Sequence, residues 1–378
     1  MNNNHADQSK IVFLSLAHLL NDWYMNYIQT LLPFMVAAGL GISKGAFLIS
    51  AFTITSSILQ PVLGYLTDQK SQRWMVYVGT LWMAVLLSLV GVLKNYPLLL
   101  LVAALAGLGT AAFHPQASSM VSAVSGERKG FFQALFISAG NIGWALTPLI
   151  VVPFTQKYGL ALTPLFVLPG VIVAIKLFFT APRISAERKS PPPIWTVLGT
   201  VWADLVRVML VVASRSLAYF GLVAFLPLYL QHEHISLLSG SRMLFLMLFS
   251  GAMGGLAGGY LSDLVGRRAV IISSLIAASP LFYLFLNTGS PLNYLFLILA
   301  GACLMASFSV TVVVAQEIIT GNAAIAAGLT LGFGIGIGGL GVGLVGLMAE
   351  KAGIVFAVRF LICLPLLAGL FGLTIKKK

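Results

Sequence analysis

The chain has 378 residues, of which 59% are hydrophobic and only 8% are charged. Soluble domains carry about 25% charged residues, so this composition excludes an ordinary soluble fold and indicates a protein of the lipid bilayer. The net charge of +12 is spread over loops and chain ends, which points to membrane topology and anionic lipid and argues against a nucleic-acid ligand.

We expect twelve apolar stretches to form membrane-spanning helices, because a hydrocarbon core about 30 Å thick requires roughly 20 apolar residues per helix. These stretches are 11–38, 46–66, 74–93, 97–122, 130–154, 160–181, 204–230, 239–262, 269–287, 292–318, 325–349 and 353–375. They leave no room for a sizeable soluble domain. The polar tail before the first stretch lacks the basic region and cleavage site of a signal peptide, so we expect the first helix to be retained.

The distribution of lysine and arginine predicts the orientation in the membrane. If both termini face the cytoplasm, thirteen basic residues lie at cytoplasmic ends and loops, and four lie on the opposite side. This asymmetry is the positive-inside bias. We therefore expect a multi-pass protein of the cell inner membrane with both termini in the cytoplasm.

A polar face runs along the first predicted helix, in HLLNDWYMNYIQTLLP at 18–33. At about 1.5 Å per residue, Asp22 lies roughly 17 Å deep, where a charge costs from ~3 to more than 10 kcal/mol unless water, a partner or protonation relieves it. Helical spacing places His18, Asp22, Asn26 and Gln29 on one face, which should line a cavity. Burial favours the protonated carboxyl, so Asp22 is a candidate proton carrier. The alternative is a packing carboxylate bonded permanently to its neighbours.

His114, in the fourth predicted helix, is the second candidate for proton coupling. Pro115 follows it directly, so we expect a kink that frees backbone carbonyls to line a cavity. Imidazole titrates near neutral pH, which suits a proton relay or a substrate contact. A purely structural histidine is the alternative. Weaker candidates for lining the substrate site are Tyr24, Asn26, Gln29, Gln116 and Asn141.

The second half of the sequence repeats the first. GYLTDQKSQRW at 64–74 and GYLSDLVGRRA at 259–269 are 195 residues apart. We expect a six-helix half at 1–181, a cytoplasmic linker at 182–203 that contains three consecutive prolines, and a second six-helix half at 204–378. Parallel six-helix halves are a transporter architecture with the substrate site near mid-membrane.

Arg215 lies eleven residues into the seventh predicted helix, at the same depth as Asp22. The two residues lie on equivalent helices of the two halves and carry opposite charges, so we hypothesise that they pair. A guanidinium stays charged and binds carboxylate or phosphonate with two hydrogen bonds, so Arg215 is also a candidate substrate ligand. A purely structural ion pair is the alternative.

Several motifs now carry a family resemblance. GYLSDLVGRR resembles the loop signature of the major facilitator superfamily, Gly-x-Leu-x-Asp-x-x-Gly-Arg-Arg. LNDWYMNYIQTLLPFM, SSILQPVLGYLTD, AAFHPQASSM and QALFISAGNIGWALTPL together resemble the fosmidomycin-resistance branch of that superfamily, a group of proton-driven efflux pumps. The resemblance implies an all-α integral membrane fold of twelve helices in two pseudo-symmetric halves that alternate in access.

The repeated loop motif predicts a gating latch at the cytoplasmic rim. A carboxylate at a helix end, Asp68 or Asp263, can pair with an arginine a few residues on, Arg73 or Arg268, and Gly266 permits the turn between them. The alternative is that these arginines only satisfy the positive-inside rule. The predicted latch residues are Asp68, Arg73, Asp263, Arg267, Arg268 and Glu317.

We therefore expect a monomeric secondary transporter that exports a small anionic or zwitterionic compound in exchange for protons. The sequence shows no nucleophile, metal cluster or cofactor motif, so we expect neither an enzyme nor a bound cofactor or metal. A channel is the remaining alternative outside the transporter class. Thr147-Pro148 replaces the Gly-Pro of the exporter signature, which leaves a proton-coupled importer of an organic anion as the alternative.

Overall fold

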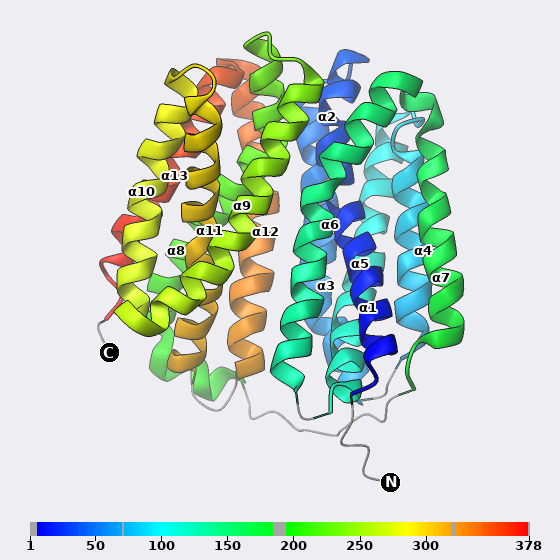
Figure 1. Ribbon diagram of the computed structural model, residues 1–378, viewed down its shortest axis with the longest axis vertical. Coiled ribbons are helices and arrows are strands. Elements are labelled where there is room, and N and C mark those ends of the chain that lie inside the picture. The colour runs from blue at the N-terminus through cyan, green and yellow to red at the C-terminus, as the bar shows by residue number, and fades with distance from the viewer. Residues whose placement is uncertain (1–5, 70–71, 127, 184–193, 320–322, 377–378) are drawn as a thin grey trace. The chain divides into compact units, whose positions relative to one another are not determined.

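The computed structural model describes residues 6–69, 72–126, 128–183, 194–319 and 323–376. Within these ranges the regular structure is entirely helical (Figure 1). Ten membrane-spanning segments are single helices, and two consist of two consecutive helical segments. The predicted all-α, twelve-helix class is therefore confirmed.

The first span is broken, where the sequence predicted one continuous helix. It consists of α1 (Gln8–Met25) and α2 (Tyr27–Ala37), and Asn26 lies between them. The side-chain amide of Asn26 donates to the backbone oxygen of Trp144 at 2.9 Å, which fixes the break against a neighbouring helix. Pro33, inside α2, has no backbone N–H to continue the helical hydrogen bonding toward the break.

The remaining spans of the first half follow the predicted order. They are α3 (Ile42–Gln69), α4 (Trp74–Leu89), α5 (Tyr96–Val124), α6 (Lys129–Tyr158), and a sixth span made of the 3₁₀ segment η1 (Leu160–Phe166) and α7 (Val167–Thr180).

The second half supplies six longer helices. They are α8 (Ile194–His232), α9 (Leu237–Val265), α10 (Arg267–Asn287), α11 (Leu292–Ile318), α12 (Ala323–Ala352) and α13 (Ile354–Gly372). Helix α8 begins ten residues earlier than expected, inside the predicted linker at 182–203. The three linker prolines lie outside the described residues.

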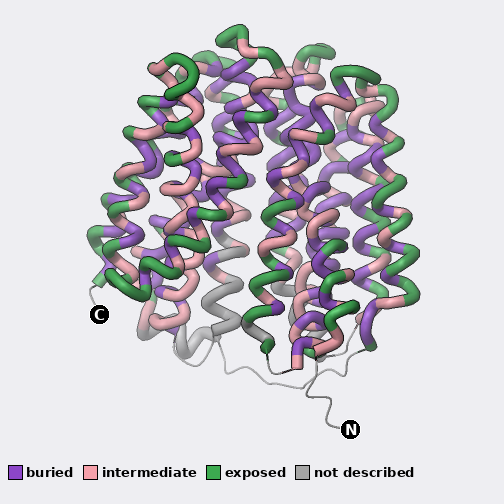
Figure 2. Tube along the Cα trace, viewed as in Figure 1, coloured by how far each residue is buried: buried purple, intermediate pink, exposed green. Residues whose placement is uncertain are grey.

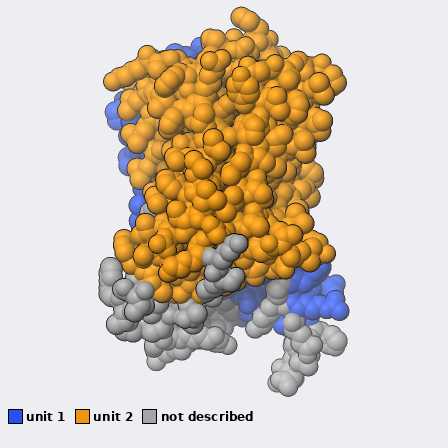
Figure 3. Space-filling model, turned by 90° about the vertical axis from the view of Figure 1, so that its left-hand side faces the viewer, with its two compact units in different colours: residues 1–40, 47–189 blue, residues 41–46, 190–378 orange. Residues whose placement is uncertain are grey.

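The chain forms two compact units, coloured separately in Figure 3: residues 1–40 with 47–189, and residues 41–46 with 190–378. The same helix contacts recur in each unit. In the first, α1 packs on α6, α4 on α5, and α4 on α7; in the second, the corresponding pairs are α8 with α12, α10 with α11, and α10 with α13. The two halves of the sequence repeat therefore fold alike.

Exposed residues recur along the helices (Figure 2), and many of them are large and apolar. Large side chains such as Phe179, Ile172 and Leu344 are exposed by 66–75% on single helix faces, as lipid contact requires. Ten of the described helices are long and apolar enough to cross a bilayer. Helix α1 is not among them, because its polar side chains lower its mean hydropathy; this helix holds the candidate site.

Helix α1 starts in water and runs into a close contact with α6. Asp7 caps its N-terminus by accepting from the backbone N–H of Lys10, and hydrogen bonds from the side chains of Lys10 and Ser9 lower the pKa of the Asp7 carboxyl. Further along, a Cβ placed on Gly143 of α6 would lie 1.9 Å from the backbone oxygen of Leu19. Only glycine allows α1 and α6 to approach this closely, and that approach brings the polar face of α1 against α6.

Candidate functional site

Asp22 is held by two histidines from different helices. The Nε2 atom of His114, on α5, lies 2.9 Å from Oδ1 of Asp22, and Nε2 of His18, one turn before Asp22 on α1, lies 3.4 Å from Oδ2. The three side chains are 6%, 16% and 20% exposed for His18, Asp22 and His114. We call these three residues the His–Asp–His triad.

Both imidazole rings are anchored through their other nitrogen. Nδ1 of His18 lies 2.7 Å from the backbone oxygen of Phe136 on α6, and Nδ1 of His114 lies 3.0 Å from the backbone oxygen of Thr110. A carbonyl oxygen can only accept, so each Nδ1 carries a hydrogen. The ring of His18 also stacks on Phe136 at 4.0 Å between centroids. Each Nε2 atom is therefore left to interact with Asp22, and both face its carboxylate.

Gly140 of α6 forms the wall of the triad. A Cβ added there would lie 2.4 Å from Oδ2 of Asp22 and 2.8 Å from Nε2 of His18. The α6 backbone thus packs directly on the carboxylate and one imidazole and keeps bulk water away from that side. Thr147, one turn beyond Gly143, adds a hydrogen bond from its hydroxyl to the backbone oxygen of Trp23 at 2.8 Å.

The ligand atoms of the triad lie within 4.8 Å of one another, close enough to share a metal ion. The direct 2.9 Å contact between His114 and Asp22 is a hydrogen bond, however, and it leaves no room for an ion between those two atoms. The arrangement is therefore a hydrogen-bonded carboxylate–imidazole pair with a second imidazole beside it.

Arg215 is the charged centre of the second unit. Its side chain belongs to α8 and is only 2% exposed. It donates to the hydroxyls of Thr311 and Ser216, both at 3.3 Å, and its guanidinium carbon lies 4.8 Å from the ring centroid of Phe308. Among the described residues, no carboxylate of this unit pairs with it. Two long hydrogen bonds leave most of its five N–H groups available to an anion. The predicted pair of Asp22 and Arg215 joins the two units and stays a prediction.

Two of the predicted lining residues have structural partners. The hydroxyl of Tyr24 donates to the backbone oxygen of Phe166 and accepts from the N–H of Gly170 at 3.1 Å, so it ties α1 to the sixth span. The side-chain oxygen of Gln116 accepts from the backbone N–H of Gln72 at 2.9 Å, at the start of α4. We leave both out of the proposed substrate site.

The other three predicted lining residues have side-chain atoms that are available for further contacts. Asn26 uses its amide N–H on Trp144, but its Oδ1 atom is buried and has no hydrogen-bond partner among the described residues. The Oε1 atom of Gln29 is also buried and has no hydrogen-bond partner among the described residues. Asn141, on α6, is exposed on its own unit. Buried polar atoms are normally satisfied, so the open acceptors of Asn26 and Gln29 are suited to a ligand or water.

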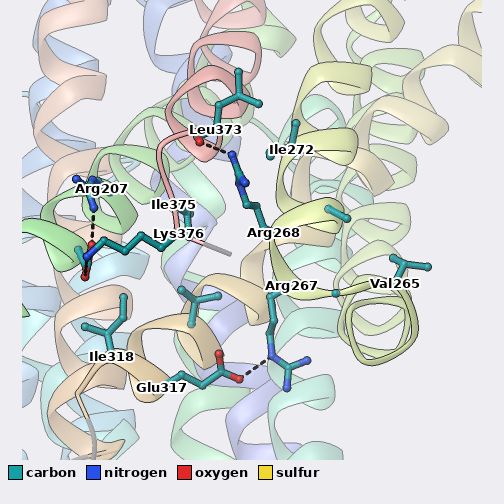
Figure 4. A pocket seen from close by; sticks show the side chains of 14 residues that line it. Arg207, Val265, Arg267, Arg268, Ile272, Glu317, Ile318, Leu373, Ile375 and Lys376 are labelled. Atoms are coloured by element: carbon teal, nitrogen blue, oxygen red, sulfur yellow. Dashed lines mark hydrogen bonds and ion pairs between the residues drawn. The ribbon is translucent and has the colours of Figure 1, made fainter. Parts of the chain in front are cut away.

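The predicted latch of the second unit forms with a different arginine (Figure 4). Asp263 pairs with Arg267 at 2.5 Å, where the sequence predicted Arg268, and Arg267 also binds Glu317 at 3.0 Å. The reason is helix geometry: Gly266, at φ +95°, turns the chain between α9 and α10 so that Arg267 faces α11, while Arg268 donates to the backbone oxygen of Leu373 on the other side.

The first copy of the latch is only partly visible. Arg73 donates to the backbone oxygens of Ala181, at 2.8 Å, and Phe178, at the end of α7. The side chain of Asp68 lies outside the described residues. The first copy therefore anchors the start of α4 to the end of the sixth span.

Beside the latch of the second unit lies a cavity of about 620 Å³ between α8, α10, α11 and α13 (Figure 4). Its apolar wall includes Ile272 and Ile318. Its charges are mostly paired: Asp204 binds both Arg207 and Lys376, at 2.5 and 2.9 Å. Ion pairs thus connect the helix ends that line this cavity.

Comparison with known proteins decides the family. A family model described as Major Facilitator Superfamily matches residues 14–339. This chain belongs to the major facilitator superfamily. Its members are membrane transporters and not enzymes, which agrees with the repeated six-helix units.

Relatives within the superfamily support the predicted branch. The chain is 30% identical over 366 residues to the Fosmidomycin resistance protein of Escherichia coli, covering 94% of this chain and 89% of that protein. It is 29% identical to the uncharacterized MFS-type transporter YfnC of Bacillus subtilis, with 95% and 91% covered. The solved structure of the nucleoside transporter NupG matches with a TM-score of 0.81 at 15% identity, over 97% of this chain and all of that chain, and so shares the fold.

Sequence reasoning gave two residues of this site less weight than the structure does. His18 was seen only as a neighbour on the polar face, although its spacing of four residues from Asp22 is the signal of a helical pair. Gly140 carried no signal that separates it from the other glycines of α6, because its role depends on what α1 places against it.

Proposed function

We propose that this transporter exports a small anionic or zwitterionic compound in exchange for protons, from the cytoplasm across the inner membrane, with both termini in the cytoplasm. The observation that carries the proposal is the partly buried hydrogen bond between His114 and Asp22, because it places a titratable pair inside a membrane-spanning bundle. The halves alternate in access as two rocking bodies.

Proton coupling follows from what the triad can bind. A carboxylate in the membrane interior is costly unless a proton or a partner neutralises it. Here the partners are imidazoles, which themselves titrate near neutral pH, so neutralisation and proton uptake are the same event. A permanent structural pair would be served better by Arg or Lys, which do not release their protons in this range.

An anionic substrate follows from Arg215. Its guanidinium keeps its charge when buried, and the described part of its unit offers it hydroxyls and an aromatic face but no carboxylate. An unpaired buried charge is unfavourable, so an anion from the substrate stabilises it. Carboxylates and phosphonates both fit, since each accepts two parallel N–H bonds. The name of the Escherichia coli relative makes fosmidomycin the first compound to test.

The test is proton movement in proteoliposomes that enclose a pH-sensitive dye, upon addition of fosmidomycin or other small anions. The variants are Asp22→Asn, Arg215→Gln and, as a matched control, Arg242→Gln, which changes an exposed arginine of α9. We expect Asp22→Asn to abolish substrate-dependent proton movement. Arg215→Gln should raise the substrate concentration for half-maximal rate about 10- to 100-fold, because a hydrogen bond to a charged group contributes about 1.5–3 kcal/mol. Arg242→Gln should match the wild type.

Proton movement that survives Asp22→Asn would remove the triad from the coupling mechanism. A normal half-saturating concentration in Arg215→Gln would remove Arg215 from the substrate site. The same residues also serve a proton-coupled importer, so the direction needs its own measurement. Accumulation of labelled substrate in inside-out vesicles, driven by an acidic interior, supports export, and accumulation only in right-side-out vesicles with an acidic exterior supports import.

A further inference from the structure

The hydrogen bond between His114 and Asp22 already contains a proton. Nδ1 of His114 donates to Thr110, so a neutral His114 has only a lone pair on Nε2. A lone pair 2.9 Å from an ionised carboxylate oxygen is repelled and would not stay there. One proton therefore lies between the two atoms, as imidazolium with carboxylate or as imidazole with carboxylic acid, and this pair is neutral overall.

His18 faces the other carboxylate oxygen of Asp22, Oδ2, but makes no hydrogen bond to it. Its Nδ1 carries a hydrogen toward Phe136 at 2.7 Å, so in the neutral ring Nε2 is a lone pair facing Oδ2 of Asp22. The separation of 3.4 Å is longer than a good hydrogen bond and agrees with an absent proton. Stacking on Phe136 and the Nδ1 bond hold the ring in this orientation.

The surroundings offer His18 no other ionic partner. Among the described residues, the charged or titratable groups that act on it are Asp22 on its own helix and His114 on α5. Helix α6 presents the backbone oxygen of Phe136 and the bare Cα of Gly140, and α4 and α7, which also pack on α1, present no titratable group to it. A proton on Nε2 can be stabilised only by Asp22.

We infer that His18 is the second proton acceptor of the triad, which alternates between one and two bound protons. This inference rests on the proposed proton coupling. The second proton comes from a hydronium ion on the side to which the unit is open. One O–H bond of that ion breaks and leaves water, an N–H bond forms at Nε2 of His18, and this N–H donates to Oδ2 of Asp22. The triad changes from neutral to a charge of +1, and returning the proton to water on the other side completes the cycle.

The test separates the two nitrogens of the ring. In His18→Asn, the asparagine amide takes the place of Nδ1 and keeps a donor for Phe136, but no atom can bind a proton at the position of Nε2. The control is His232→Asn, at a histidine that is 59% exposed. Nitrogen-15 spectra of histidine-labelled protein in micelles are recorded about two pH units either side of 6.5, the ordinary imidazole pKa.

We expect the Nε2 signal of one imidazole, His114, to stay constant over this whole range, because its hydrogen bond to Asp22 holds one proton throughout. A second buried imidazole should change its Nε2 from acceptor to N–H as the pH falls, and its signal should be missing in His18→Asn and present in His232→Asn. An Nε2 of His18 that stays a lone pair throughout, or a His18 whose Nδ1 is the unprotonated nitrogen, overturns the inference.

A transport measurement tells failure of this inference from failure of the proposed function. Each coupled proton contributes about 1.4 kcal/mol per pH unit, so losing one lowers steady-state fosmidomycin accumulation tenfold at a gradient of one pH unit. We expect that tenfold loss in His18→Asn. Wild-type accumulation in His18→Asn with complete loss in Asp22→Asn refutes the role of His18 alone. Wild-type accumulation in both refutes proton coupling through the triad.

Discussion

The substitution Gly140→Ala tests the geometry of the triad without touching a titratable group. The new Cβ would lie 2.4 Å from Oδ2 of Asp22 and 2.6 Å from Cε1 of His18, well inside van der Waals contact. Separating the helices would relieve the overlap only by opening the close contact between Gly143, on the next turn, and the backbone of Leu19. We therefore expect the carboxylate and the imidazole to move instead.

The size of the effect follows from these distances. Ordinary contact begins near 3.4 Å, so the Asp22 carboxylate must shift by about 1 Å, and a shift of that size along its 2.9 Å bond to His114 would lengthen the bond to about 3.9 Å. That is beyond hydrogen-bond length. A hydrogen bond to a charged group contributes about 1.5–3 kcal/mol, so we expect proton-coupled transport to fall about 10- to 100-fold.

The assay is the initial rate of substrate-driven pH change in proteoliposomes, with the amount of folded protein checked by size-exclusion chromatography. Gly336→Ala is the matched control, since a Cβ on this glycine of α12 meets nothing within 4 Å. Its only effect should be the gain of up to about 1 kcal/mol from better helix propensity. A Gly140→Ala protein with the wild-type rate and the wild-type pH dependence would falsify the packing argument.

Two further predictions concern the ends of the helices. Arg267→Gln should lower the free energy of unfolding by no more than about 2 kcal/mol, because its two pairs are partly exposed and each contributes about 0–1 kcal/mol, yet it should change the transport rate if the latch controls gating. Thermal unfolding and transport measured on one preparation check this, and an unchanged rate counts against the latch. Asp7→Ala should remove about 1 kcal/mol of capping stabilisation and so speed hydrogen exchange in the first turn of α1. The bonds from Lys10 and Ser9 lower the pKa of Asp7 in the folded protein. The stabilisation from the cap is therefore complete above the ordinary carboxyl pKa near 3.9 and is lost as the pH falls through the lower pKa of the folded state. Below that pH, wild type and variant should show the same exchange rates.

Much of the site could be proposed from the sequence because its elements lie close together along the chain. Asp22 stands out as a charge deep in an apolar segment, and His18 lies one helical turn before it. His114 stands out by its type. That His114 contacts Asp22, 92 residues away, depends on how α5 rotates against α1, and no local pattern encodes that rotation.

The same limit explains the predictions that changed. Tyr24 lies on the helix that bears the triad, but its side chain turns to the sixth span and bonds there. Arg267 and Arg268 are adjacent and chemically identical, and only the direction of the turn at Gly266 decides which of them meets Asp263. The break at Asn26 arises because Trp144 offers a backbone oxygen to its side chain.

The sequence by itself determined the lipid environment of the protein, its twelve spans and its two repeated halves, because hydropathy and helical period act over neighbouring residues. The tertiary structure alone decided which polar side chains bond to one another. Helix rotation and approach set those partners, and in the first unit they are fixed by the absence of side chains at Gly140 and Gly143. A carboxylate one turn from a histidine is thereby pressed against α6 and joined by a second histidine from α5, so a pattern typical of many helices becomes a triad of titratable groups.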